Sequence, residues 1–109
     1  MSRRLHVHLL PELTTEEALA ESHVVVIDVL RASTTIVHAL ASGAAEVIPC
    51  LETDDARELS KRLASDNPLL GGERGGEPID GFDMGNSPTE YVESKVRGRK
   101  IIFTTTNGT

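Results

Sequence analysis

Short apolar runs alternate with polar and glycine-rich segments along the chain. The run at 24–30 is apolar at every position except Asp28, which is typical of a strand that is covered on both faces. Shorter apolar stretches predict four further strands, at 5–10, 47–50, 69–70 and 100–106. The strand predicted at 5–10 places His6 and His8 on one face. Spacing alone allows these two histidines either a structural role or a role as a pair of metal ligands.

Helices are predicted between these strands. Ser33 is suited to cap a helix whose apolar side includes Ile36 and Leu40. The segment 53–64 has an apolar stripe, with acidic residues at its start and basic residues at its end, as the helix dipole favours. Capping boxes predict two more helix starts, at Thr14 and Ser87.

This alternation of strands and helices indicates βαβ units, which place successive strands in parallel. We therefore expect a three-layer α/β/α fold with a mostly parallel sheet of about four to five strands. The length of 109 residues fits a single α/β domain over residues 1–109 and leaves no room for a second.

Composition narrows the range of partners. The formal net charge is -6 and basic residues do not interleave with aromatic ones, so we expect no nucleic-acid partner. No apolar run approaches the ~18 residues of a membrane span, so we expect no membrane partner and a cytoplasmic location. The lone Cys50 excludes an internal disulfide, and its setting favours a buried thiol over a nucleophile.

The segment 28–35 gathers polar chemistry at the end of the predicted central strand. In an open parallel sheet, ligands bind beyond the carboxyl ends of the strands, where the next helices begin. Asp28 offers a hard oxygen for Mg²⁺, and Arg31 offers a bidentate grip on phosphate. Three hydroxyl residues follow at the helix start, Ser33, Thr34 and Thr35. Spacing alone leaves a second interpretation open, in which these residues only cap and begin a helix.

Two further segments lie at predicted strand ends. The glycine loop at 71–76 is suited to an anion nest, with Arg74 as a phosphate contact and Glu73 as a metal ligand or base. A flexible glycine turn with a surface ion pair is the alternative. The segment 104–109 ends a strand in hydroxyls and an amide, although its Asn107-Gly108 pair is also a common hairpin turn.

Four blocks of sequence together resemble the 2-phosphosulfolactate phosphatases, a family of coenzyme M biosynthesis. The similarity lies in the order and spacing of the blocks, which are spread over most of the chain. These blocks are the segments 26–36, 70–76, 81–88 and 104–109. Members of that family are longer, so the resemblance identifies this sequence as the N-terminal part of a larger enzyme.

The resemblance implies a Mg²⁺-dependent hydrolase that converts (2R)-2-phospho-3-sulfolactate to (2R)-3-sulfolactate and phosphate. The small-molecule partner is then a phosphorylated, sulfonated acid. A homodimer is an open expectation for the protein itself. In the implied site, Asp28 and Glu73 hold the metal, while Arg31 and Arg74 offset charge on the phosphoryl oxygens. Direct attack by water and attack by a side chain such as Asp28 both remain open.

The same comparison implies a set of substrate-binding residues. They are Ser33, Thr34, Thr35, Asn86, Ser87, Thr106, Asn107 and Gly108. Two other classes of function remain as alternatives to an enzyme. One is a non-catalytic anion-binding module, and the other is an α/β half that works only when it pairs with a partner.

Overall fold

The structure is a computed structural model that describes residues 2–107. Its described part contains a three-stranded parallel sheet in the order β1-β3-β2, with the strands β1 (Glu46–Pro49), β2 (Leu69–Gly72) and β3 (Lys100–Thr104). The central β3 pairs with both neighbours, so that Ile102 lies opposite Ile48 on one side and Leu70 on the other. The α/β class with parallel strands is confirmed.

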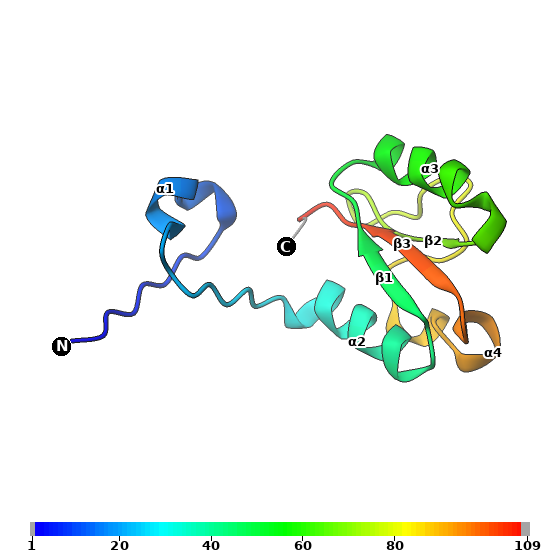
Figure 1. The fold of residues 1–109 in the computed structure, drawn as a ribbon, viewed down its shortest axis with the longest axis horizontal. Coiled ribbons are helices and arrows are strands. Elements are labelled where there is room, and N and C mark those ends of the chain that lie inside the picture. Colours follow the sequence, from blue (N-terminus) through cyan, green and yellow to red (C-terminus); the bar gives the residue numbers. More distant parts are fainter. Residues whose placement is uncertain (1, 108–109) are drawn as a thin grey trace.

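Helices flank this sheet. They are α2 (Thr34–Ala41), α3 (Thr53–Arg62) and α4 (Glu93–Val96), whereas α1 (Glu16–Leu19) lies away from the sheet in the N-terminal segment (Figure 1). Single helical turns also occur at Pro11–Leu13, Val29–Ser33, Ala64–Asp66 and Pro88–Glu90. Figure 1 shows α3 along one side of the sheet, with α2 and α4 along the other. None of these helices is long and apolar enough to cross a membrane.

The core is built around β3 and the single tyrosine. Tyr91 is buried and packs edge-on against Phe103, with 6.3 Å between ring centroids. Its hydroxyl donates to the backbone oxygen of Gly85 at 2.6 Å, which satisfies the polar end of the ring. Gly71 is required beside it, because a side chain there would overlap the Tyr91 hydroxyl. This packing fixes the end of β2 against the segment that leads to α4.

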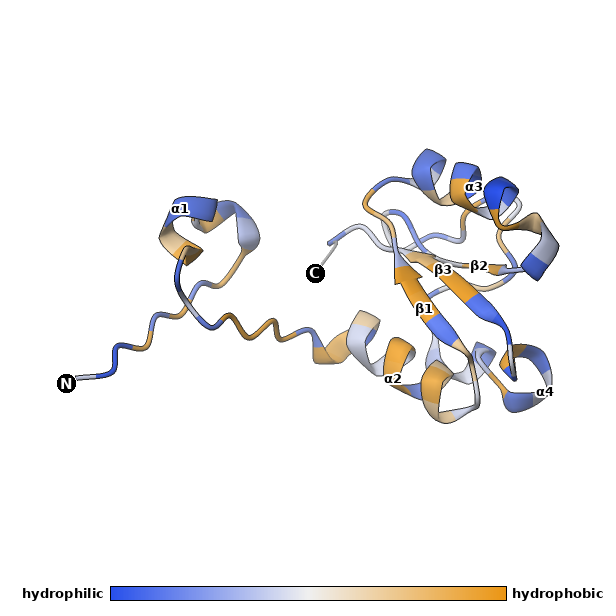
Figure 2. Cartoon of the chain, viewed as in Figure 1, coloured by the Kyte–Doolittle hydropathy of each residue, from blue (hydrophilic) through white to orange (hydrophobic). Residues whose placement is uncertain are grey.

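Two predicted strands are wrong. Residues 5–10 and 24–30 form no strand in the described structure, and Figures 1 and 2 show an apolar stretch that runs away from the sheet toward the N-terminus. Side chains such as Val25 and Ile27 are exposed there. An apolar run indicates a segment that favours burial, but a strand also needs a neighbour for its backbone hydrogen bonds. The described residues supply no such neighbour, so the expected four to five strands and three layers are not confirmed.

Candidate functional site

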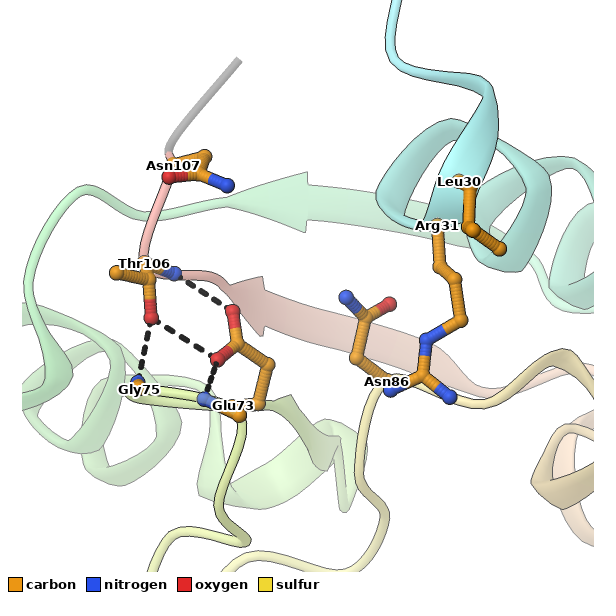
Figure 3. Close-up of a pocket in the computed structure, with 8 residues that line it drawn as sticks. Leu30, Arg31, Glu73, Gly75, Asn86, Thr106 and Asn107 are labelled. Carbon is orange, nitrogen blue, oxygen red and sulfur yellow. Dashed lines mark hydrogen bonds between the residues drawn. The ribbon is translucent and has the colours of Figure 1, made fainter.

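An open pocket of about 500 Å³ lies beyond the carboxyl ends of β2 and β3. Figure 3 shows its lining residues as sticks. Its lining residues come from four separate segments and are Leu30, Arg31, Glu73, Gly75, Gly76, Asn86, Thr106 and Asn107. The position follows the rule for open parallel sheets, because Glu73 comes directly after β2 and Thr106 follows β3.

Glu73 is the most connected side chain of this pocket. One carboxylate oxygen, Oε1, accepts the backbone N–H of Thr106 at 2.8 Å. The other oxygen, Oε2, accepts the backbone N–H of Gly76 at 2.7 Å and the Thr106 hydroxyl at 2.9 Å. The Thr106 hydroxyl oxygen in turn accepts the N–H of Gly75 at 2.7 Å. The carboxylate therefore joins the glycine loop to the residues that follow β3 (Figure 3).

This environment favours the charged form of Glu73. Partial burial acts to raise the pKa of the carboxyl. The backbone N–H groups of Thr106 and Gly76, the Thr106 hydroxyl and the positive charge of Arg74 act in the opposite direction and prevail. The net result is a pKa below the ordinary value of 4.5, so Glu73 is a carboxylate at neutral pH.

The opposite edge of the pocket carries a positive charge. Arg31 is exposed and extends into the pocket next to Asn86 (Figure 3). The side-chain oxygen of Asn86 is buried and has no hydrogen-bond partner among the described residues. A buried amide oxygen without a partner is costly, and a ligand that donates to it would remove this cost.

Arg74 points to a different place from its neighbour Glu73. Its guanidinium donates to the backbone oxygen of Thr105 at 2.6 Å, to the Thr104 hydroxyl at 2.7 Å and to the Thr53 hydroxyl at 3.3 Å. A further bond goes to the backbone oxygen of Leu51. Arg74 thus ties the ends of β1 and β3 together at the start of α3, and it does not line the pocket.

The remaining predicted residues divide between two places. Asp28 is half-buried and stands just before the helical turn Val29–Ser33, outside the pocket lining. Ser33 and Thr34 line a second recess of about 390 Å³ beside α2 instead.

Two further predicted residues hold local structure near the pocket. Thr35 is buried, and its hydroxyl donates to the backbone oxygen of Asn86 at 3.5 Å. The Ser87 hydroxyl is 3.0 Å from that of Thr89. Gly108 lies outside the described residues.

The sequence analysis did not predict one residue that lines the pocket and one residue that supports the strand ends. Leu30 lines the pocket, and its position directly before Arg31 was the available signal. Thr53 supports the site through Arg74. Nothing in the sequence pairs Thr53 with Arg74, because the rest of α3 and the strand β2 lie between them.

The pocket offers oxygen ligands for a hard cation. The described residues contain no group of three or more His, Cys, Asp and Glu side chains that could hold a metal. Mg²⁺ commonly binds through one or two carboxylates together with water and substrate phosphate, so it does not need such a group. A carboxylate has about four lone-pair positions, and Glu73 uses three of them. Glu73 and the unpartnered Asn86 oxygen therefore fit a Mg²⁺ ion.

The fold and pocket are those of a parallel α/β protein with a polar site at its strand ends. The model of the 2-phosphosulpholactate phosphatase family matches residues 8–109. The chain therefore belongs to this family, and the resemblance recognised in its sequence is confirmed.

Individual relatives agree with this assignment. A protein of Caldanaerobacter subterraneus subsp. tengcongensis, named "probable 2-phosphosulfolactate phosphatase", is 58% identical over 91 residues, which cover 84% of this chain and 38% of that protein. Proteins with the same name are 49% identical in Clostridium beijerinckii (78% and 36% covered) and 44% identical in Clostridium perfringens (97% and 44% covered). The chain thus spans less than half the length of these curated relatives.

Proposed function

We propose that the family polypeptide containing this chain hydrolyses the phosphate ester of (2R)-2-phospho-3-sulfolactate in a Mg²⁺-dependent reaction. The observation that carries the proposal is the pocket itself, which places a guanidinium, a carboxylate and two amide side chains beyond the strand ends. In the reaction, the oxygen of water bonds to phosphorus and the ester P–O bond breaks. The departing alkoxide takes a proton and leaves as 3-sulfolactate.

Arg31 is the residue that binds the anionic substrate in this proposal. It is exposed in the pocket and its guanidinium has five donors that match phosphoryl or sulfonate oxygens. The side-chain amide of Asn86 adds neutral donors and an acceptor beside it, and that of Asn107 does so across the pocket, next to Thr106 (Figure 3). The N–H groups of Gly75 and Gly76 contribute less, because they already donate to Thr106 and Glu73.

Charge explains why a cation belongs in this pocket. The Glu73 carboxylate faces the same space as the anionic substrate, and like charges without screening repel. Glu73, with the side-chain oxygen of Asn86, is proposed to hold Mg²⁺, whereas Asp28, the second metal ligand proposed from the sequence, lies outside the pocket lining. The chemistry that the ion supplies when bound is polarisation of the phosphoryl group and a more acidic water.

An assay of the longer family polypeptide tests the proposal. It compares 2-phospho-3-sulfolactate with simpler phosphate esters, with Mg²⁺ and with a chelator, and follows phosphate release. We expect Arg31→Ala to lower kcat/KM by at least about tenfold, which corresponds to the loss of a hydrogen bond to a charged group. Arg62→Ala, on the exposed side of α3, is the matched control. Turnover unaffected by the chelator, or by the Arg31 substitution, would contradict the proposal.

A partner-pairing module is the second candidate function. The exposed apolar side chains of residues 24–30 favour it, because a monomer seldom leaves such a stretch uncovered. A homodimer of the chain would be one form of this pairing. Light scattering over a range of protein concentrations tests it, and a monomer at all concentrations would exclude the homodimer.

A further inference from the structure

The two edges of the pocket differ in what they offer to a ligand. Thr106 has one hydroxyl hydrogen, and this hydrogen is directed to Glu73 at 2.9 Å. The backbone N–H of Thr106 is directed to the same carboxylate at 2.8 Å. Both hydrogens that Thr106 has to offer are therefore used inside the protein.

The backbone N–H groups of the glycine loop are also used in hydrogen bonds within the protein. The N–H of Gly75 donates to the Thr106 oxygen at 2.7 Å, and the N–H of Gly76 donates to Glu73 at 2.7 Å. Apart from the side-chain amide of Asn107, this edge leaves toward the pocket only lone pairs on oxygen, together with the negative charge of Glu73. Lone pairs attract cations, water and other donors, and they repel phosphoryl oxygens.

We propose that Glu73 is a positioning residue that holds Thr106 against the glycine loop and makes this edge of the pocket accept donors but exclude anions. Phosphoryl oxygens are then confined to the opposite edge, beside Arg31 and Asn86. The water that attacks phosphorus has its acceptors on the Glu73–Thr106 edge. The confinement of the phosphoryl oxygens and the place of the attacking water rest on the proposed function. The hydrogen-bonded clamp, in which Glu73 holds Thr106 against the glycine loop, does not.

The clamp is tested by NMR on the 109-residue chain, without any assay of catalysis. In the unaltered chain, the amide signals of Thr106 and Gly76 should shift together during an acid titration, because both amides donate to the same carboxylate. In Glu73→Gln, hydrogen exchange at the Thr106 amide should accelerate by at least about tenfold. Glu77→Gln, an exposed change in the same loop, should leave the exchange of Thr106 unchanged.

The anion preference is tested with inorganic phosphate as the probe. We expect phosphate to move the side-chain signals of Arg31 and Asn86 and to leave the Thr106 amide unmoved. In Glu73→Gln, the Thr106 amide should begin to respond, since the charge that excludes phosphate is gone. Separate titration of Thr106 and Gly76, or a phosphate response at Thr106 in the unaltered chain, would overturn the assignment.

Kinetics of the longer polypeptide separate positioning from a purely structural role. Glu73→Gln should lower kcat by at least about tenfold and change KM much less, because substrate binding depends on the Arg31 edge. Thr106→Ser keeps the hydroxyl and should retain kcat, whereas Thr106→Val should lose it. An equal loss in both Thr106 variants would overturn the positioning role. If the polypeptide has no phosphatase activity, the proposed function fails, and the NMR result still decides the clamp.

Discussion

The strand β3 and the N-terminal segment (residues 2–28) have similar apolar side chains but opposite surroundings. Ile101 and Ile102 are 0% exposed, whereas Val25 and Ile27 are 81% and 79% exposed. β3 has a hydrogen-bonded strand on each side, and the N-terminal segment has none in the described structure. The difference shows that backbone partners, and not apolarity alone, decide which of these stretches becomes a buried strand.

The comparison also separates what supports the pocket from what only adjoins it. Glu73, Arg74 and Thr106 belong to the sheet and to the loops at its ends, and they bond to one another's segments. Asp28 and Arg31 stand where the N-terminal segment joins α2. The pocket therefore combines one edge that the sheet fixes with another that depends on the course of this junction.

Truncation of matched isoleucines gives the largest expected contrast. Ile102→Ala should lower the free energy of unfolding by about 2–5 kcal/mol, because it leaves a cavity in a fully buried strand. Ile27→Ala removes the same atoms from an exposed site and should change stability by less than about 0.5 kcal/mol. Urea denaturation followed by circular dichroism measures both. A large loss in Ile27→Ala would show that the N-terminal segment is buried in solution.

Removal of Arg74 should have the next largest effect. Arg74→Ala removes the guanidinium donor from the oxygens of Thr104 and Thr105, and it leaves the Leu51 oxygen with only the Thr104 hydroxyl, at 3.2 Å. We expect a loss of about 2–3 kcal/mol in the free energy of unfolding, since bonds to a charged donor contribute more than neutral ones. Arg62→Ala is the control, because Arg62 is exposed in α3. Equal stability of the two variants would mean that Arg74 does not brace the strand ends.

The sequence indicated the central features of the sheet and of the pocket. The strand at β3, the helix after Ser33 and the long glycine loop follow from local patterns of apolar residues and glycines. The predicted cap at Ser33 is wrong, because Ser33 is itself helical and its side chain makes no capping hydrogen bond. The carboxyl-end rule pointed to Arg31 and Glu73, which the structure brings to one pocket.

The remaining features depend on tertiary contacts that local patterns do not contain. Glu73 and Arg74 are neighbours in an extended segment and point to different places, so the sequence could not tell which of them faces the pocket. The strand predicted at 24–30 failed for a related reason, because its pattern did not specify a partner strand.

Acid sensitivity should give the smallest of these effects and should arise on the fixed edge of the pocket. The pKa of Glu73 is lower in the folded chain than its ordinary value of 4.5, so folding favours the carboxylate. The stabilisation from this group is therefore complete above that value and is lost as the pH falls through the lower, folded pKa. We expect the stability advantage of the unaltered chain over Glu73→Gln to shrink below about pH 4.5. Thr106→Val removes one of the bonds that lower this pKa, so it should move the loss to a higher pH. Urea denaturation at several pH values measures the three chains, and an advantage that stays constant with pH would show that the Glu73 carboxylate is not held by these donors.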